Sequence, residues 1–509
     1  MKKLFNIRPI VVLSCFFILG ILSAVYFRIV DNLLLCVLLG LVLIVVCAIL
    51  DLFVFKKLKF LRSEKFYLLV VSALISFLVS YFVTDLSLSR KASDDIGNGL
   101  YYISATVDEV GESFVVLDDI KLDDRSSSHY KLNGKVIMFY DNDEGLGIEE
   151  GNTIVFFGSY NYTFDLNDEN CLKYISSGTV GRVAGVGNIE VVEDSVSVRA
   201  KVLRAFDNSY GQSMSKENSS IAKAFLFGDK SDFSKEVETV FSNAGVMHLF
   251  AVSGLHIGFL CSILTMLLSK LFKNKKVCSI IIFALLFVYS WICGFSPSVT
   301  RALIMMGVVM MSQIFGRQYD GINSLALASL IILIISPFQL FSVGFILSFC
   351  AVLSIFCFEP MITCGLAKFL PGKFASYISV TLAAQVGTVP VVAYYFSTIQ
   401  LGSIFANVLS VYVATLTFSL LVASFILSLI FPVLSVLFVV PNFLLTILCD
   451  ISHAISILDI NISVGHFPVA FMYLVVLGLF LGGEYSFLKR KWVYIVGAYV
   501  LFICGIVLL

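Results

Sequence analysis

Charged side chains are scarce in this 509-residue sequence, in which Asp, Glu, Lys and Arg together make up 14% of the residues. Apolar residues make up 59%, a share far outside the range of soluble domains. A bilayer-spanning helix needs an apolar run of about 18 residues or more. Such runs occupy residues 10–26, 33–55 and 66–83, and they return almost without pause over 246–509. The composition excludes a soluble protein and predicts a polytopic α-helical membrane protein.

Patterns that hold metals, nucleotides or disulfide frameworks are also missing. The twelve cysteines include no CxxC pair and no Cys/His cluster at zinc spacing. All but one lie within or beside apolar segments, where a thiol behaves as a small hydrophobe. Cys171 alone lies in a polar stretch; it could pair between chains, but a lone thiol is the favoured interpretation. No Walker-type phosphate loop occurs. We therefore expect no metal and no cofactor.

Basic residues predict which side of the membrane each segment faces, because cytoplasmic loops carry the excess of Lys and Arg. Lys2, Lys3 and Arg8 place the N-terminus inside, and residues 1–84 then form three transmembrane helices. We expect the first of these to be an uncleaved span rather than a signal peptide. With about 13 spans in the chain, the later basic clusters at 270–276, 317 and 489–491 all fall on the cytoplasmic side. The protein is thus expected in the cytoplasmic membrane, with residues 85–245 on the non-cytoplasmic side.

The exported residues 85–196 are predicted to form a β-rich domain. Short segments rich in Val, Ile, Phe, Tyr and Thr alternate with Gly, Asn and Asp clusters, which is typical of strands separated by turns. The segments are 101–110, 113–120, 135–140, 152–160 and 179–192. About five strands in about a hundred residues suit a small barrel, and an OB-like fold is one candidate. The domain is acidic, with about nine basic and about twenty-one acidic residues between 85 and 199.

Residues 197–245 are predicted to form amphipathic helices on the outer membrane face. One helix covers 198–210 and a second covers 232–243, each with apolar residues at helical spacing. The apolar positions are Val198, Val202, Leu203, Phe206 and Tyr210 in the first helix, and Phe233, Val237, Val240 and Phe241 in the second.

The most informative stretch for function is 243–260, NAGVMHLFAVSGLHIGFL. His248, Ser253 and His256 are polar residues in a run otherwise apolar enough to span the membrane, and Ser253-Gly254 predicts a break in the helix. A histidine at membrane depth is a functional-site hypothesis by default. Each could instead satisfy a neighbouring helix by hydrogen bonding. A Ser–His nucleophile is a further alternative, but no acidic partner occurs in the same segment.

A second polar stretch is 293–306, CGFSPSVTRALIMM. Pro297 follows Ser296 at the expected start of a span, and Arg301 lies only a few residues inside it. Arg301 could extend to the membrane interface. It could equally line an aqueous path and contact an anionic substrate, because the guanidinium group matches phosphate geometry.

Both stretches belong to a longer series that closely resembles the competence domain of the ComEC family. The first block is AFLFGDKSDFSKEVETVFSNAGVMHLFAVSGLHIGFL (224–260), and the second is GFSPSVTRA (294–302). The others are SLALASLIILIISPFQLFSVGFILSFCAVL (324–353), AAQVGTVPVVAYYF (383–396) and IFANVLSVYV (404–413). Five ordered blocks over about 190 residues are far more specific than one motif. The N-terminal layout, a few spans followed by an external OB-like domain, is also similar to that family.

The resemblance implies a role in natural transformation, because ComEC proteins are taken to form the inner-membrane channel for one strand of incoming DNA. For this chain it implies passage of single-stranded DNA through the transmembrane domain at 246–509, with the exported domain near the entrance. The motif positions implied to line the path are His248, Ser253, Gly254, Leu255, His256, Ser296, Pro297, Arg301 and Asn407. Further implied partners are a separate DNA receptor, a nuclease, and a cytoplasmic ATP-driven motor or DNA-binding proteins; the chain could also form an oligomer.

One departure from the family matters for enzyme activity. Many members end in a metallo-β-lactamase-like domain with an HxHxDH motif, which this sequence does not contain. We therefore do not expect an enzyme. Two alternatives to the DNA channel remain, a transporter of another anionic or lipid-linked substrate and an intramembrane hydrolase using Ser253 and His256. The acidity of the exported domain argues against an electrostatic DNA clamp. Any DNA contact there would fall to aromatic residues such as Tyr140, Tyr160 and Tyr162, or to the basic residues of the helix that follows.

Overall fold

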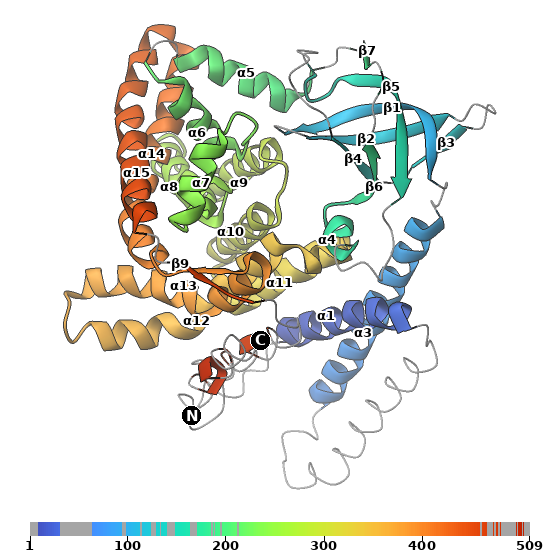
Figure 1. Cartoon of the computed structure of the whole chain (residues 1–509). Coiled ribbons are helices and arrows are strands. Elements are labelled where there is room, and N and C mark those ends of the chain that lie inside the picture. The colour runs from blue at the N-terminus through green and yellow to red at the C-terminus, as the bar shows by residue number, and fades with distance from the viewer. Residues whose placement is uncertain are drawn as a thin grey trace.

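The computed structural model describes residues 9–30, 64–93 and 98–458, then 461–465 and scattered residues up to 502. Within 98–458 it leaves short gaps at 112–113, 124–128, 133, 140–147, 163–170, 185–186, 188, 194–195 and 211–212. The span expected at 33–55 and the basic cluster at 489–491 lie outside the described residues. The described chain forms a β-barrel beside a large helical body (Figure 1).

Two long apolar helices precede the barrel. α1 (Pro9–Val30) packs along α3 (Glu64–Ser93) and also contacts α11 (Gly321–Ile335). Ser14 and Ser329 share a hydrogen bond between their hydroxyl groups at the α1–α11 contact. The N-terminal helices are therefore joined to the C-terminal helical body and do not form a separate unit.

The strands that follow α3 form a closed five-stranded barrel. Its strands are β1 (Gly99–Val110), β2 (Phe114–Asp123), β4 (Lys135–Phe139), β5 (Thr153–Tyr162) and β6 (Thr179–Ala184). The sheet runs β1-β2-β4-β6-β5, and the pairing of β5 with β1 closes it; β4 and β6 are parallel, and the other pairs are antiparallel. Alternate side chains point inward, as in Ile103, Ala105 and Val107 of β1, and fill the core.

The predicted strands are confirmed in position, with one difference. The segment expected as one strand at 179–192 is two, β6 and β7 (Glu190–Glu193), and a short β3 (His129–Lys131) adds to β2. The expectation that Tyr160 contacts DNA is wrong, because its ring is fully buried in the barrel core. The side chains of Tyr140 and Tyr162 lie outside the described part. Period-two alternation along β5, where Ile154 and Phe156 are also buried, explains the inward direction of Tyr160.

Three helices connect the barrel to the transmembrane block: α5 (Val198–Tyr210), α6 (Lys216–Phe227) and α7 (Lys235–Asn243). The two predicted helices are present as α5 and α7, and most of their apolar side chains pack on protein, while Val198 of α5 is exposed. Phe206 of α5 is fully buried against Phe425 and Phe438, and Phe241 of α7 contacts Phe250. The interfacial placement expected for 197–245 stays a prediction.

The helical body follows after a 3-10 turn, η4 (Met247–Phe250). Its elements are α8 (Gly254–Leu271), α9 (Lys275–Ile292), α10 (Pro297–Phe315), α11, η5 (Pro337–Phe341), α12 (Val343–Leu366), α13 (Gly372–Phe396), β8 (Thr398–Gln400), α14 (Ser403–Ile430), η6 (Pro432–Phe438), α15 (Val439–Ile457) and β9 (Asn461–Ser463). The α12–α13 hairpin and the α14–α15 hairpin run across one another (Figure 1).

Eight helical segments of the described chain are long and apolar enough to cross a membrane. They are the part of α3 at Val71–Ser89, then α8, α9, α10, α12, α13, α14 and the continuous η6–α15 unit. α1 and α11 contribute shorter apolar stretches. The protein is thus an integral membrane protein with many spans. The expected total of about 13 includes segments that the structure does not describe.

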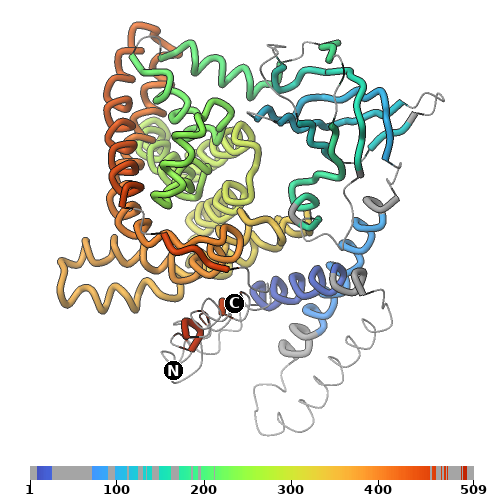
Figure 2. The backbone as a smooth tube through the Cα atoms, viewed as in Figure 1, coloured from blue at the N-terminus to red at the C-terminus, as the bar shows by residue number. Residues whose placement is uncertain are grey.

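The barrel joins the helical body at two places. A small helix after β5, α4 (Cys171–Ser176), packs on η5, where Cys171 and Ile175 are buried with Phe338. This burial removes the thiol of Cys171 from reach of a second chain. The other junction is α5, which leaves the barrel and runs to the α14–α15 hairpin (Figure 2).

Candidate functional site

The helix break predicted at Ser253-Gly254 is present between η4 and α8. Ser253 is extended and caps α8: its Oγ accepts from the N–H of Leu255 at 3.3 Å, and Nδ1 of His256 accepts from the N–H of Ser253 at 3.0 Å. This reciprocal arrangement is a capping box, which satisfies donors that a helix start leaves free. The three-residue spacing of Ser253 and His256 therefore has a structural cause at the start of α8.

His256 is also the aromatic centre of the site. Because Nδ1 accepts a backbone hydrogen bond, the neutral ring carries its proton on Nε2. The ring is 2% exposed and lies between Phe225 of α6 and Phe418 of α14, with centroid distances of 5.1 and 4.7 Å. Within the described residues, Nε2 has no hydrogen-bond partner. His256 thus joins three helices and directs an unsatisfied donor into the protein.

Arg301 lies directly beside the start of α8. Its Nη1 donates to the carbonyl oxygen of Ser348 on α12 at 2.6 Å, and a Cβ built on Gly254 would lie 3.1 Å from its Nη2. The residue is 6% exposed, so it does not extend to the membrane interface as one alternative supposed. In the described part of the chain no carboxylate forms an ion pair with it, and its Nε has no partner. A cation is therefore held inside the protein at the N-terminal end of a helix.

Asn407 brings α14 to the same region. Asn407, Ser410 and Phe418 lie on the buried face of α14, and Oδ1 of Asn407 has no partner within the described residues. One turn earlier, Ser403 approaches Gly245 so closely that a Cβ on that glycine would collide with it. Gly245 also has a φ of +71°, which favours glycine. The start of α14 is thus fixed against the segment that precedes η4.

The remaining motif positions lie at the surface of this centre. His248 is exposed, and Leu255 is half-buried. Ser296 precedes α10 at the cap position but makes no cap hydrogen bond, and Pro297 occupies the first turn, where its missing N–H is not needed. The structure therefore brings Ser253, Gly254, His256 and Arg301 into one buried centre around α8, with Asn407 on the facing helix.

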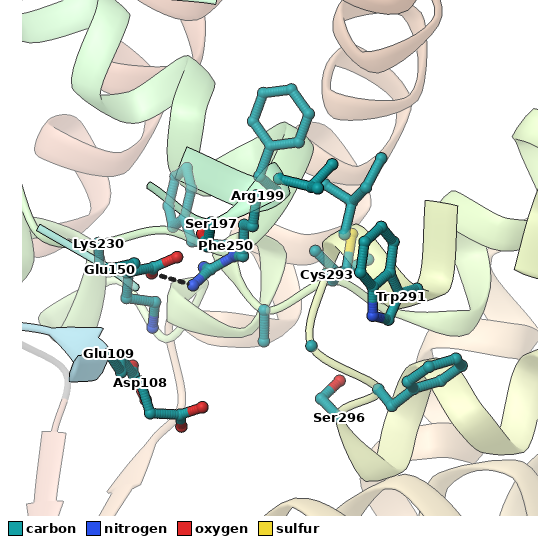
Figure 3. A pocket seen from close by; sticks show the side chains of 18 of the residues that line it. Asp108, Glu109, Glu150, Ser197, Arg199, Lys230, Phe250, Trp291, Cys293 and Ser296 are labelled. Carbon is teal, nitrogen blue, oxygen red and sulfur yellow. Dashed lines mark hydrogen bonds and ion pairs between the residues drawn. The ribbon is translucent and has the colours of Figure 1, made fainter. Parts of the chain in front are cut away.

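A cavity of about 700 Å³ opens between the barrel and the two motif stretches (Figure 3). Its volume lies within the range of about 300–1,000 Å³ typical of ligand sites. The motif stretches supply its floor through residues 250–252 and 291–296, which directly precede α8 and α10. Three acidic and three basic side chains line it, so its formal charge is zero: Asp108, Glu109, Glu150, Lys135, Arg199 and Lys230.

Ion pairs hold the barrel loop at one wall of this cavity. Glu150 pairs with Arg199, and Glu149 pairs with Arg204, so two carboxylates of the barrel contact two guanidinium groups of α5. The backbone N–H of Ser197 adds a hydrogen bond to the carbonyl of Glu150 at 3.0 Å. Burial raises the pKa of the Glu150 carboxyl to about 7, although Arg199 acts in the opposite direction. Figure 3 shows this pair on the side of the cavity opposite Trp291.

A third charged cluster fixes α6, which the sequence analysis did not predict. Lys223 is buried in the middle of α6 and pairs with Asp207 of α5, at 3.1 Å, and with Asp232 in the turn before α7. This triad joins all three connecting helices beside the cavity. Within the described residues no group of His, Cys, Asp and Glu could hold a metal ion.

The cavity and the lysine-rich loop lie at opposite ends of the same helices. α8 starts and α9 ends at the cavity, while the loop between them carries Lys270, Lys273, Lys275 and Lys276. Each helix has 18 residues, which is about 27 Å at 1.5 Å per residue and close to the thickness of a bilayer core. This separation agrees with a barrel on one side of a membrane and the basic loop on the other.

Sequence reasoning missed the contribution of the barrel and of α5 to the site. Glu150 and Arg199 are distant from the motif stretches along the chain. They lie at the cavity only because the barrel packs against the helical body. One signal was available in Gly228-Asp229-Lys230, where a glycine with φ of +76° ends α6 and places Lys230 at the cavity. Trp291 and Phe295 also line the cavity, although they carry no polar signal that the sequence could have shown.

Comparison with known proteins covers much of the chain. A family model described as Competence protein matches residues 225–488. ComE operon protein 3 of Bacillus subtilis (strain 168) is 24% identical over 365 residues, which are 69% of this chain and 45% of that protein. An uncharacterized protein of Aquifex aeolicus (strain VF5) is 32% identical over 191 residues, covering 37% of this chain and 44% of that protein.

Recombination protein 2 of Haemophilus influenzae is 29% identical over 182 residues, which are 34% of this chain and 23% of that protein. The chain thus spans less than half the length of these curated relatives. No solved structure matches it. Because the family match covers more than half of its residues, this chain belongs to the Competence protein family, the ComEC-type family that the five motif blocks indicate.

Proposed function

We propose that this protein is a channel that carries single-stranded DNA across the cytoplasmic membrane during natural transformation. The strand enters from the barrel side through the cavity and passes the buried centre around the start of α8. The barrel, residues 99–193, is then an OB-like domain on the non-cytoplasmic side. Its closed order, with one parallel pair between β4 and β6, supports that assignment. The protein is proposed to act without enzyme activity.

The observation that carries the proposal is the environment of Arg301. A buried cation without a carboxylate partner is costly, and it is usually retained where an anion binds or passes. The N-terminus of α8 beside it adds a partial positive charge. Both groups come from the competence motif blocks, and the segments before them form the floor of the cavity. A phosphate group in this place would contact the guanidinium group and the helix start together.

The charge balance of the cavity agrees with conduction rather than storage. A transported polyanion needs weak and repeated contacts, because one tight site would stop it. With three acidic and three basic side chains, the cavity wall has no net charge to hold a strand. Arg301 then provides one charged contact for the phosphates at the start of α8, beyond the cavity.

A transporter of another anionic or lipid-linked substrate is the alternative, since Arg301 would serve any phosphate. The five motif blocks favour DNA over that alternative. The third hypothesis, a hydrolase using Ser253 and His256, is disfavoured by geometry. Although Oγ of Ser253 lies 3.0 Å from Nδ1 of His256, both atoms also take part in the capping of α8. A separate DNA receptor, a nuclease and a cytoplasmic motor or DNA-binding proteins are proposed partners, and assembly into an oligomer is compatible with the proposal.

The test is uptake of labelled DNA by host cells in which this protein is deleted and then restored. We expect the deletion to abolish entry of label into the cytoplasm, and Arg301→Gln to restore far less than the wild-type protein. Arg301→Lys keeps the charge without the planar fork and should be intermediate. Lys368→Gln, which removes an exposed charge in the turn between α12 and α13, is the control and should restore fully. Normal cytoplasmic uptake in the deletion strain would refute the proposal.

A further inference from the structure

Two aromatic side chains, Trp291 and Phe295, line the cavity at the turn between α9 and α10. They are 50% and 36% exposed, and both border the cavity, whereas the exposed Phe283 and Phe287 of α9 do not. The last turn of α9 is fixed from the inside, because the hydroxyl of Tyr289 donates to the carbonyl of Leu226 at 2.7 Å. Cys293 lies on the same side of the helix, with its Sγ 3.9 Å from that carbonyl oxygen.

This anchoring determines where Trp291 lies. At 100° per residue, a side chain two positions from both Tyr289 and Cys293 emerges on the other side of the helix. The Trp291 ring is therefore held away from α6, at the edge of the cavity. Figure 3 shows it across the cavity from the Glu150–Arg199 pair.

Phe295 reaches the cavity through strained backbone. Its φ is +48°, directly after Gly294 at +72°, and a bulky residue with positive φ is an outlier. Such a conformation is costly and concentrates at functional sites. Its N–H donates to the carbonyl of Ser290 at 3.0 Å, and its ring is supported at its edge by Phe287, with 5.3 Å between centroids. The turn therefore holds an aromatic ring in solvent at a conformational cost.

The charge of the cavity indicates what these rings contact. With balanced charges on its wall, the cavity cannot hold DNA through its phosphates alone. Exposed aromatic rings bind nucleic acid by stacking on the faces of unpaired bases. Each stacked base contributes about 1–3 kcal/mol of binding free energy. In a duplex those faces are already stacked on one another and are not available.

We propose that Trp291 and Phe295 form a stacking platform for the bases of the incoming strand, and that this platform selects single-stranded over duplex DNA at the cavity. The inference rests on the proposed function and names the part of the DNA that is recognised. The bases contact the aromatic side of the cavity, and the phosphates face the charged side formed by the barrel and α5.

Binding of two oligonucleotides to the full chain in lipid nanodiscs tests the proposal. One is a fluorescent 20-mer of thymidylate, and the other is an abasic 20-mer with the same number of phosphates. We expect the base-bearing strand to bind about 5- to 100-fold more tightly, from one stacked base or more. Phe295→Leu and Trp291→Leu should each remove most of this difference and leave the abasic affinity unchanged, while Phe295→Tyr should preserve it.

Phe315→Leu is the control, since that ring is exposed at the far end of α10. Equal binding of both strands by the wild-type chain would overturn the stacking platform and leave the DNA channel standing. If neither strand binds, the platform fails, and the channel is then decided by the uptake assay alone. If the Leu variants lower thermal stability in the nanodisc but keep both affinities, the rings anchor the protein at the membrane interface and the inference is wrong.

Discussion

Three of the motif residues carry a buried polar atom that has no partner among the described residues. Nε2 of His256, Nε of Arg301 and Oδ1 of Asn407 all lack hydrogen bonds among the described residues, and all three belong to the motif blocks. Each unsatisfied buried group costs about 1–3 kcal/mol. A fold that keeps two of them, on His256 and Arg301, beside the start of α8 gains something else from them. Contact with a passing polar ligand is the gain that we propose.

Gly254 provides a sharp test of this centre. In Gly254→Ala, the new Cβ would lie 3.1 Å from Nη2 of Arg301 and 3.5 Å from Cβ of Ala302, so the guanidinium group must move by a few tenths of an ångström. We expect DNA uptake to fall several-fold, because the contact between Arg301 and the start of α8 is disturbed while the helix itself is not. The measurement is cytoplasmic uptake, together with the amount of folded protein in the membrane.

Gly258→Ala is the matched control on the same helix. A Cβ there meets nothing within 4 Å, and alanine favours a helix by up to about 1 kcal/mol over glycine. This variant should keep uptake and be as stable as the wild type or slightly more stable. Equal uptake by the two variants would show that close approach of Arg301 to α8 is not needed.

At the scale of elements, the barrel and α5 meet through the Glu150–Arg199 and Glu149–Arg204 pairs, and this contact should depend on pH. Burial raises the pKa of Glu150 to about 7 from an ordinary value of 4.5. Asp108, Glu109 and Asp229 raise it further, and Arg199 lowers it. Because the folded state holds the proton more tightly, the stabilising contribution is fully present below pH 4.5 and is lost as the pH rises through about 7.

Glu150→Gln should therefore stabilise the protein at pH 8 and have little effect at pH 5. The gain in the free energy of unfolding at pH 8 is at most about 3 kcal/mol, and it is smaller if water reaches the Glu150–Arg199 pair. Thermal unfolding of the variant and the wild-type protein at several pH values measures it. A difference in Tm that stays constant from pH 5 to pH 8 would contradict the role given to burial of this carboxyl group.

The elements differ in how far they could be predicted from the sequence. Strands β1, β2, β4 and β5 follow from alternation and turn residues, and α5 and α7 follow from helical spacing. Helix α6 was not predicted from the sequence. Ten of its twelve residues are buried, Lys223 among them, so it lacks the polar face that marks an amphipathic helix. The capping of α8 by Ser253 and His256 is local and was predictable as a break. The approach of Glu150 and Arg199 depends on tertiary packing, which no local pattern encodes.

For the whole molecule, the central feature is that one end of α8, α9 and α10 belongs to the cavity and the other end to basic loops. Arg317 follows α10 at the same end as the lysines between α8 and α9. The barrel covers the cavity end (Figure 1). A strand that enters at the barrel and leaves past the basic loops would cross the membrane once along these helices.

This arrangement predicts which positions a membrane-impermeant maleimide can reach. Ala184→Cys in the barrel and Lys273→Cys in the loop between α8 and α9 are both exposed positions. In intact cells we expect label on Ala184→Cys alone, and label on Lys273→Cys only after the membrane is made permeable; the parent chain gives the background of the native cysteines. Because α8 and α9 are each about one bilayer long, the two positions cannot share a side unless these helices lie flat. Labelling of Lys273→Cys in intact cells would therefore overturn the orientation and, with it, the direction of DNA entry.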